Sequence, residues 1–258
     1  MSAATATAGG ARGRRRGRRG VVVLVVLVLV LAVLAVVAEL VLRHVVDRTI
    51  ADRIESSLPS GTAGHVVADA HGVVIPQLVA GRLDDVDIMT HDLTVRGVPL
   101  AVDATVHDVP VRGTGRTGRA DGTVRLTASA VRQAGVLDQV AGDVRLRDGG
   151  VAYAGRTRFL GTDIRYQVTA AVAAAASGRG VTITPHQVRV TNSALGIDVG
   201  GRIPGVSGTP VDVCTARYLP AALRLRSIAI TASAATIRID AAHVPLSDDA
   251  LRTTGSCS

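Results

Sequence analysis

The order of apolar and polar positions divides the chain into three parts, and the first is a long apolar run. Residues 21–38 read VVVLVVLVLVLAVLAVVA without a polar side chain, and the run resumes over residues 40–42 after Glu39. At 1.5 Å per residue, a helix over residues 21–42 is about 30 Å long, which matches the hydrocarbon core of a membrane. The pattern therefore predicts one transmembrane helix over residues 21–42.

A cleaved signal peptide is the alternative interpretation of this run. Val36-Val37-Ala38 places small residues at the offsets expected for cleavage, which would make Glu39 the first mature residue. The apolar core of a secretory signal is usually about 7–15 residues long. The run here is longer, which favours an uncleaved anchor.

A second pattern, with apolar residues four positions apart, follows the span. Val46, Ile50, Ile54 and Leu58 share this spacing, and acids and arginines fill the positions between them. Such spacing predicts an amphipathic helix, which Pro59 and Gly61 would end. It either continues the membrane helix or bends just outside it.

From residue 86 onwards the apolar period is two, which is typical of strands with one buried face and one wet face. Examples are Val98 to Val106, Ile164 to Val168 and Ile228 to Ile230, with turn signals such as Asp148-Gly149-Gly150 between strands. A further helix is expected over residues 129–140. The predicted fold class is α+β, with many antiparallel strands and few helices.

A similar seven-residue segment occurs twice and interrupts this alternation. His91-Asp92-Leu93-Thr94-Val95-Arg96-Gly97 is followed sixteen residues later by His107-Asp108-Val109-Pro110-Val111-Arg112-Gly113. The apolar positions change parity at each His-Asp pair, so each pair is predicted to be a β-bulge that keeps the apolar side facing inward. A metal site is the alternative, but no further His or Asp is placed on a helix to complete it.

Other motifs do not predict an enzyme or a cofactor. Residues 113–118, GTGRTG, fit the glycine pattern of a dinucleotide-binding loop, but a strand pattern follows where that fold needs a helix. The seven histidines show no metal-ligand spacing, and no pair of carboxylates stands out. We therefore expect no catalytic residues, no metal and no cofactor.

Charge limits the partners and indicates the orientation of the span. The residues before the run carry six arginines and no acid, namely Arg12, Arg14, Arg15, Arg16, Arg18 and Arg19. Basic residues flanking a span stay in the cytoplasm, which predicts a cytoplasmic tail over 1–20 and an extracytoplasmic domain over 43–258. Without these six, 23 arginines balance 21 acids, and the chain has no Trp, one Phe and three Tyr. A nucleic-acid partner is not expected, because it would need a basic face and usually aromatic platforms.

Both cysteines, Cys214 and Cys257, lie in the part predicted to be exported. An oxidising compartment allows a disulfide to persist. The two interpretations are a disulfide that ties the C-terminus to a loop 43 positions upstream, and two free thiols.

The order of these elements resembles a known family. Gly72-Val73-Val74-Ile75-Pro76-Gln77-Leu78-Val79-Ala80-Gly81-Arg82-Leu83 follows the amphipathic helix, and Leu219-Pro220-Ala221-Ala222-Leu223 precedes the last strands. Both segments are similar to those of the LmeA-like phospholipid-binding proteins of actinobacterial cell envelopes. The chain departs from the family pattern at Ile75, where an aromatic residue is usual, and at Ala222, where glycine is usual.

The resemblance implies a fold similar to the tubular lipid-binding proteins, with a curled antiparallel sheet around a long helix and an apolar groove. It implies a membrane protein whose extracytoplasmic domain binds phospholipid or another acyl lipid and supports the assembly of envelope lipid or lipoglycan. The alternative is a membrane-tethered scaffold that binds an envelope-assembly enzyme without lipid. The lipid-binding residues expected on this basis are Val73, Val74, Ile75, Leu78, Leu83, Val98, Leu100 and Val102.

Overall fold

The computed structural model describes residues 14–57, 61–112, 115–133, 142–159, 162–192, 196–202, 207–247 and 253–257. The chain divides into two compact units, Met1–Val45 and Val46–Ser258. The boundary lies three residues after the end of the predicted span.

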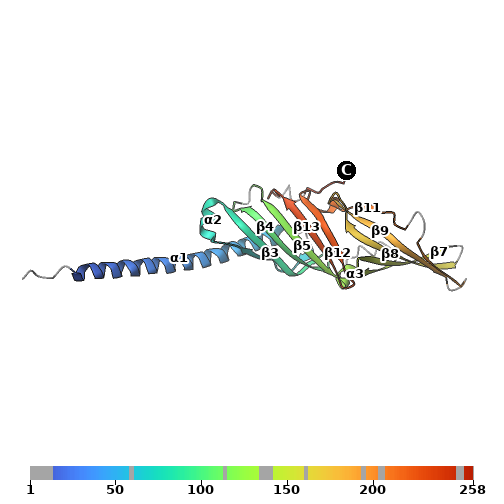
Figure 1. Cartoon of the computed structure of the whole chain (residues 1–258), viewed down its shortest axis with the longest axis horizontal. Coiled ribbons are helices and arrows are strands. Elements are labelled where there is room, and N and C mark those ends of the chain that lie inside the picture. Colours follow the sequence, from blue (N-terminus) through green and yellow to red (C-terminus); the bar gives the residue numbers. More distant parts are fainter. Residues whose placement is uncertain are drawn as a thin grey trace, which may run out of the picture. The chain divides into compact units, whose positions relative to one another are not determined.

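One continuous α-helix, α1 (Arg14–Ser57), carries both the apolar run and the amphipathic segment (Figure 1). The side chains of the valines and leucines between Val25 and Val41 are all at least half exposed. Within the described residues, α1 is the one helix long and apolar enough to cross a membrane. A helix that is apolar on all sides and uncovered by protein is suited to a lipid environment.

The last part of α1 belongs to the second unit, as the four-residue spacing predicts. Val46, Ile50 and Ala51 pack against a buried cluster formed by Ala68, Ala70, Val74, Leu83 and Val86. Two carboxylates of the helix accept hydrogen bonds from the backbone of the domain: Asp47 from Ala70 N at 3.0 Å and Glu55 from Val66 N at 3.0 Å. The helix therefore serves as one wall of the core.

The first sheet has seven antiparallel strands in the order β1-β3-β4-β5-β13-β12, with β2 beside β1 on the same edge of β3. Its members are β1 (Thr62–Ala63), β2 (Val67–Ala70), β3 (Arg82–Val95), β4 (Val98–Pro110), β5 (Arg119–Thr127), β12 (Leu223–Ile230) and β13 (Ala234–Ala242). The turn between β3 and β4 is Arg96-Gly97, in which both residues have positive φ angles, 51° and 81°. Two-residue hairpin turns of this kind match the twist of the strands they join.

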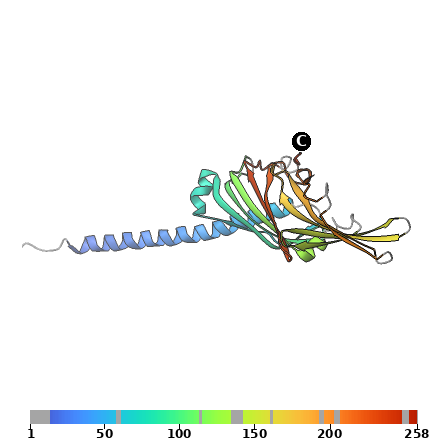
Figure 2. The same ribbon diagram turned by 45° about the vertical axis from the view of Figure 1, so that its right-hand side comes forward.

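The second sheet has six antiparallel strands. Five follow the order β10-β9-β8-β7-β6, and β11 pairs with β9 at the opposite end from β10. Its members are β6 (Gly142–Arg147), β7 (Gly150–Phe159), β8 (Thr162–Ala174), β9 (Gly180–Asn192), β10 (Ile197–Gly201) and β11 (Val211–Cys214). Backbone hydrogen bonds link it to β12 of the first sheet, from Leu225 N to Gly178 O and from Gly149 N to Ile230 O. The strands of the two sheets follow one another along the domain (Figure 1 and Figure 2).

The predicted fold class is confirmed: the domain is rich in antiparallel strands, contains little helix and is not closed into a barrel. The single curled sheet expected from the resemblance is present as two sheets. Two short α-helices complete the domain, α2 (Val74–Ala80) and α3 (Ala128–Gln133). The helix predicted over 129–140 is thus found in its first part, and residues 134–140 lie outside the described residues.

One of the two predicted bulges is confirmed. Thr90 pairs with Val102 and Leu93 with Leu100, so β3 has one residue more than β4 at His91-Asp92. At His107-Asp108 the prediction is wrong, because the register of β3 and β4 does not shift there. Asp108 has a φ angle of 52° instead, and this left-handed backbone redirects the strand without an added residue.

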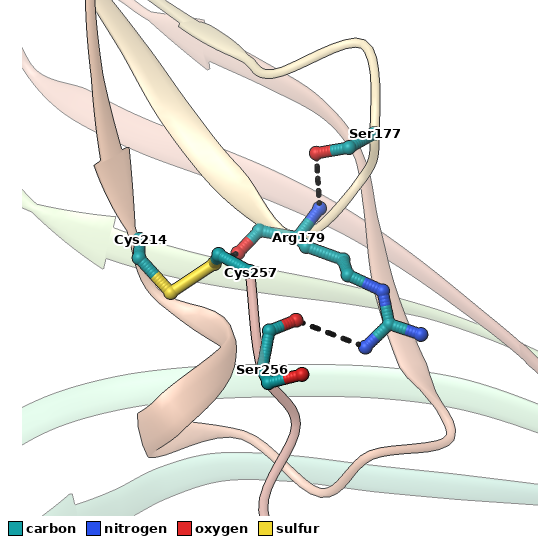
Figure 3. The surroundings of a disulfide bond; sticks show 5 residues. All are labelled: Ser177, Arg179, Cys214, Ser256 and Cys257. Atoms are coloured by element: carbon teal, nitrogen blue, oxygen red, sulfur yellow. Dashed lines mark hydrogen bonds between the residues drawn. A yellow bond between two sulfur atoms is a disulfide. The ribbon is translucent and has the colours of Figure 1, made fainter.

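The disulfide between Cys214 and Cys257 is present (Figure 3). Cys214 ends β11, and the Cys257 Sγ lies 3.1 Å from the carbonyl oxygen of Arg179, in the turn between β8 and β9. The Arg179 guanidinium donates a hydrogen bond to Ser256 O at 3.2 Å (Figure 3). The C-terminal segment is therefore held at one end of the second sheet.

Candidate functional site

Paired residues form apolar rows across the first sheet. One row crosses five strands through Ile228, Ile237, Val124, Val102 and Thr90. The next row passes through Leu225, Ile239, Gly122, Ala104, Ile88 and Ala68. Directly opposed residues in an antiparallel sheet share a face, so these rows make one face of the first sheet apolar.

The second sheet has an apolar face of the same kind. One row runs through Val144, Tyr153, Val168, Val188 and Gly201, and its neighbour through Gly142, Gly155, Tyr166, Val190 and Val199. The alternate positions carry polar residues, such as Arg145, Arg165 and Arg189. Each sheet is therefore amphipathic.

Most large side chains on these faces are only half-buried. Val74, Val86 and Leu83 are almost fully buried, at 0%, 1% and 2% exposed. Ile88, Val102 and Val124 keep part of their surface exposed, and on the edge strand β10 Val199 is 65% exposed. A domain of about 200 residues ordinarily hides most of its large aliphatic side chains. Apolar surface that stays partly exposed on a sheet face is available to a ligand or a partner.

The structure separates the eight predicted lipid-binding residues into three groups. Val98, Leu100 and Val102 lie half-buried on the apolar side of β4. Val74 and Leu83 belong to the buried cluster, and Leu78 packs against it. Val73, by contrast, is 59% exposed, and Ile75 is half-buried. Contact of these residues with lipid remains a prediction.

Two tyrosines on the second sheet's apolar face were not predicted as site residues. The rings of Tyr153 and Tyr166 lie 5.8 Å apart between centroids, and their hydroxyl oxygens are 3.5 Å apart. A methyl group at Gly155 would lie 2.5 Å from Tyr166 Cζ, so the missing side chain leaves room for the ring. In the sequence, this arrangement is indicated by a glycine at an apolar position of one strand and an aromatic residue on the next strand.

An open pocket of about 470 Å³ lies on the opposite, polar face of the first sheet. The side chains that line it include Asp87 and Met89 of β3, Asp103 and Thr105 of β4, Asp121 and Thr123 of β5, Arg226 of β12 and Arg238 of β13. Carboxylates and guanidinium groups make this pocket unsuited to acyl chains, because burying charge against hydrocarbon costs free energy.

Two histidine–aspartate ion pairs lie on the same face. His71 Nε2 is 2.8 Å from Asp87 Oδ2, and the Thr105 hydroxyl donates to the other oxygen of that carboxylate at 2.6 Å. The hydrogen bond and the charge of Asp87 raise the pKa of His71 above its ordinary value. The pKa of Asp87 is lowered, first by the hydrogen bond from Thr105 and then by that from His71. His107 pairs with Asp85 on the neighbouring strand rather than with Asp108 next to it.

Two sequence motifs considered above can be compared with the structure. The described residues contain no group of three or more His, Cys, Asp or Glu side chains arranged to hold a metal ion. The glycine-rich segment over 113–118 is followed by β5, as its strand pattern predicts, where a dinucleotide-binding loop needs a helix. Residues 113 and 114 lie outside the described residues.

Comparison with known proteins identifies a family. The family model described as LmeA-like phospholipid-binding matches residues 37–250. A search of curated proteins and a search of solved structures each find no significant match. The matched range begins in the apolar helix and contains every described strand of both sheets. On this match over most of its length, the chain belongs to the LmeA-like phospholipid-binding family.

Proposed function

We propose that this protein is anchored in the cell membrane by α1 and binds phospholipid or another acyl lipid on the apolar faces of its extracytoplasmic domain. The observation that carries the proposal is the half-buried state of these faces in a member of a phospholipid-binding family. Burial of an acyl chain gains about 0.8 kcal/mol per methylene. Ten methylenes would supply roughly 8 kcal/mol before the costs of binding, so no charged contact is required.

The proposed orientation rests on charge and on the disulfide. The arginine cluster before the apolar run favours a cytoplasmic N-terminus. The disulfide between Cys214 and Cys257 favours an oxidising compartment for the domain. An extracytoplasmic lipid-binding domain tethered to the membrane is suited to a supporting role in envelope lipid or lipoglycan assembly, with binding rather than catalysis as its contribution.

Within the predicted set, Val98, Leu100 and Val102 are best placed for lipid contact, because they are half-buried on an apolar face. Val74 is fully buried against other side chains. Lipid could reach it only if α2 moved, so we assign Val74 to the core. The tyrosines Tyr153 and Tyr166 extend the proposed surface to the second sheet.

Photo-crosslinking in a membrane tests the proposal directly. The full chain is reconstituted in vesicles with a trace of phospholipid that carries a diazirine in its acyl chain, and crosslinked peptides are identified by mass spectrometry. Crosslinks in the span serve as the internal control. Further crosslinks on β4, β5, β8 or β9 are expected. Crosslinks confined to the span would contradict the proposal and favour a scaffold that binds an envelope enzyme.

Two adjacent residues of β8 provide a matched pair of variants. Val168 lies on the apolar face and Gln167 on the polar face, and both are half-buried. Val168→Asp is expected to reduce crosslinking of the second sheet, because a charge on the apolar face must be desolvated when lipid binds. Gln167→Asp introduces the same charge on the other face and should leave crosslinking unchanged.

A further inference from the structure

The short helix α2 has a solvent-exposed apolar face. Val74 and Gln77 point into the core, being 0% and 7% exposed. Val79 is 85% exposed, more than any described valine or leucine of the apolar span. The exposed apolar residues of this region are Val73, Pro76, Val79 and Ala80, together with Val111, which follows β4. We call these five residues the α2 patch.

Several hydrogen bonds hold the α2 patch in place. The buried Gln77 amide donates to His71 O at 2.9 Å and accepts from Asp84 N at 3.0 Å. Gly81 ends the helix in a left-handed conformation, and its carbonyl accepts from Val111 N at 3.1 Å. Both sides of the α2 patch are therefore fixed to the first sheet, and its exposed valines belong to an ordered surface.

Arginines border the α2 patch. Arg82 follows Gly81 at the end of α2, and its guanidinium donates to Asp108 O at 2.8 Å and to Arg116 O at 3.4 Å. Arg82 Nε also lies 3.9 Å from Asp108 Oδ1, so these two charges partly offset each other. Arg112 and Arg116 are exposed, and no acidic side chain pairs with either among the described residues. Arg112, which follows Val111, therefore adds positive charge beside the α2 patch without a partner carboxylate among the described residues.

A short segment of chain joins the apolar run to the part of the domain that precedes the α2 patch. Asp47, five residues after Leu42, accepts a hydrogen bond from Ala70 N, and β2 ends at Ala70 four residues before α2 begins. Five residues reach at most about 18 Å, even when fully extended. If the run spans the bilayer, as proposed above, Asp47 lies within this reach of the end of the span, and the α2 patch follows Ala70 by only a few residues.

We propose that the α2 patch docks on the surface of the anionic phospholipid bilayer in which the chain is anchored. Val73 and Val79 would enter the interface between headgroups and acyl chains, and the arginines around them would contact phosphate groups. Exposed apolar side chains bordered by cations are the combination that binds anionic interfaces. The inference rests on the proposed membrane anchor and adds the surface through which the domain meets the bilayer.

The chain contains no tryptophan, so a single introduced tryptophan reports on one position. The Val79→Trp variant of the full chain is reconstituted in vesicles that contain phosphatidylglycerol, and its fluorescence is measured with and without brominated acyl chains. Docking is expected to give a blue-shifted emission that the brominated lipid quenches. Tyr218→Trp is the matched control, because Tyr218 is also strongly exposed, at 73%, but lies near the disulfide. It should show neither effect.

Three results would overturn the proposal. The first is a Val79→Trp emission that brominated lipid does not quench. The second is equal quenching in Val79→Trp and Tyr218→Trp, which would show that the domain lies on the bilayer without a preferred face. The third is shielding of the Val79→Trp probe from a soluble quencher without quenching by lipid, which would indicate a protein surface, such as a second copy of the chain.

The arginines and the lipid site have separate tests. Quenching of the Val79→Trp probe should fall in vesicles without anionic lipid, and also when Arg112→Gln and Arg116→Gln are added to the variant. Unchanged quenching in both experiments would remove the arginines from the proposal. Crosslinking on the sheets would persist if only the docking surface were wrong. The lipid-binding and docking proposals can therefore fail independently.

Discussion

At the scale of single residues, His71 and Asp87 link stability to pH. The folded pKa of His71 is raised from its ordinary value of 6.5, so its contribution is complete below that value and is lost as pH rises through the folded pKa. The folded pKa of Asp87 is lowered from 3.8, so its contribution is present above 3.8 and is lost as pH falls through the folded pKa. The pair therefore stabilises the fold most between about pH 4 and 6.5.

The variant His71→Gln should remove the part of this dependence that lies above pH 6. Melting temperatures of the wild type are expected to fall between pH 6 and pH 8 more than those of His71→Gln. His186→Gln is the control, because His186 is exposed on β9 and should keep the wild-type profile. Parallel pH profiles for the wild type and His71→Gln would contradict the prediction.

Two glycines of β7 differ in what surrounds them. A methyl group at Gly150 would lie 2.0 Å from the carbonyl oxygen of Ala170, which belongs to the backbone of β8. A methyl group at Gly155 would instead meet the end of the Tyr166 side chain, which can rotate. Gly150→Ala should therefore cost about 2–3 kcal/mol of unfolding free energy, and Gly155→Ala about 1 kcal/mol. Denaturant titration measures both, and equal costs would show that Tyr166 cannot move.

At the scale of elements, the disulfide fastens the edge strand β11 to the C-terminal segment. It closes a separation of 43 residues. Because the cross-link lowers the entropy of the unfolded chain, it is expected to stabilise the fold by about 2–4 kcal/mol. Backbone hydrogen bonds from Gly255 N to Ala216 O and Leu219 O should hold part of the segment without it. Reduction is thus expected to lower the melting temperature without unfolding the domain at 25 °C.

The double variant Cys214→Ser/Cys257→Ser separates this effect from other actions of the reductant. It should melt at the temperature of the reduced wild type and should not respond to reductant. If the wild type kept its melting temperature in reductant while mass analysis showed that the bond had opened, the disulfide would contribute nothing to stability.

The elements that follow a local period were predictable, and the pairing between distant segments was not. Alternation at Val98–Val106 fixes which side of β4 is apolar, because successive side chains point to opposite faces. It does not identify the partner strand, and β13 lies between β5 and β12 although about a hundred residues separate it from β5. The division into two sheets has the same origin. The left-handed backbone at Asp108 also has no signal in a period of two.

The candidate site was predictable in part for a similar reason. Val98, Leu100 and Val102 were placed on an apolar face by alternation, and the structure has them there. For the segment around Ile75, the sequence did not predict which residues are buried, because a helix of seven residues is too short for its period to separate a buried face from an exposed one. Hence Val74 proves to be core, whereas Val79 is 85% exposed.

At the scale of the whole molecule, the proposed function depends on the orientation of α1. The arginines before the apolar run predict a cytoplasmic N-terminus. A phosphatase that folds only outside the cytoplasm is expected to be active when fused to the C-terminus, and a fluorescent protein that folds only inside should stay dark there. The intact mass should include residues 1–38. A mature chain that begins at Glu39 would instead establish a cleaved signal and a domain without an anchor.

Replacement of Arg12, Arg14, Arg15, Arg16, Arg18 and Arg19 by glutamine provides the stronger test, because it changes the proposed cause and leaves the apolar run intact. If these charges hold the N-terminus in the cytoplasm, the variant should show reduced phosphatase activity and a gain of fluorescence. Replacement of Arg145, Arg156 and Arg165, which are exposed on the second sheet, should change neither signal. Molecules inserted in the opposite orientation would also place Cys214 and Cys257 in a reducing compartment. The fraction without the disulfide should therefore increase as phosphatase activity decreases. Unchanged orientation without the six arginines would show that another feature, such as folding of the domain after export, determines topology.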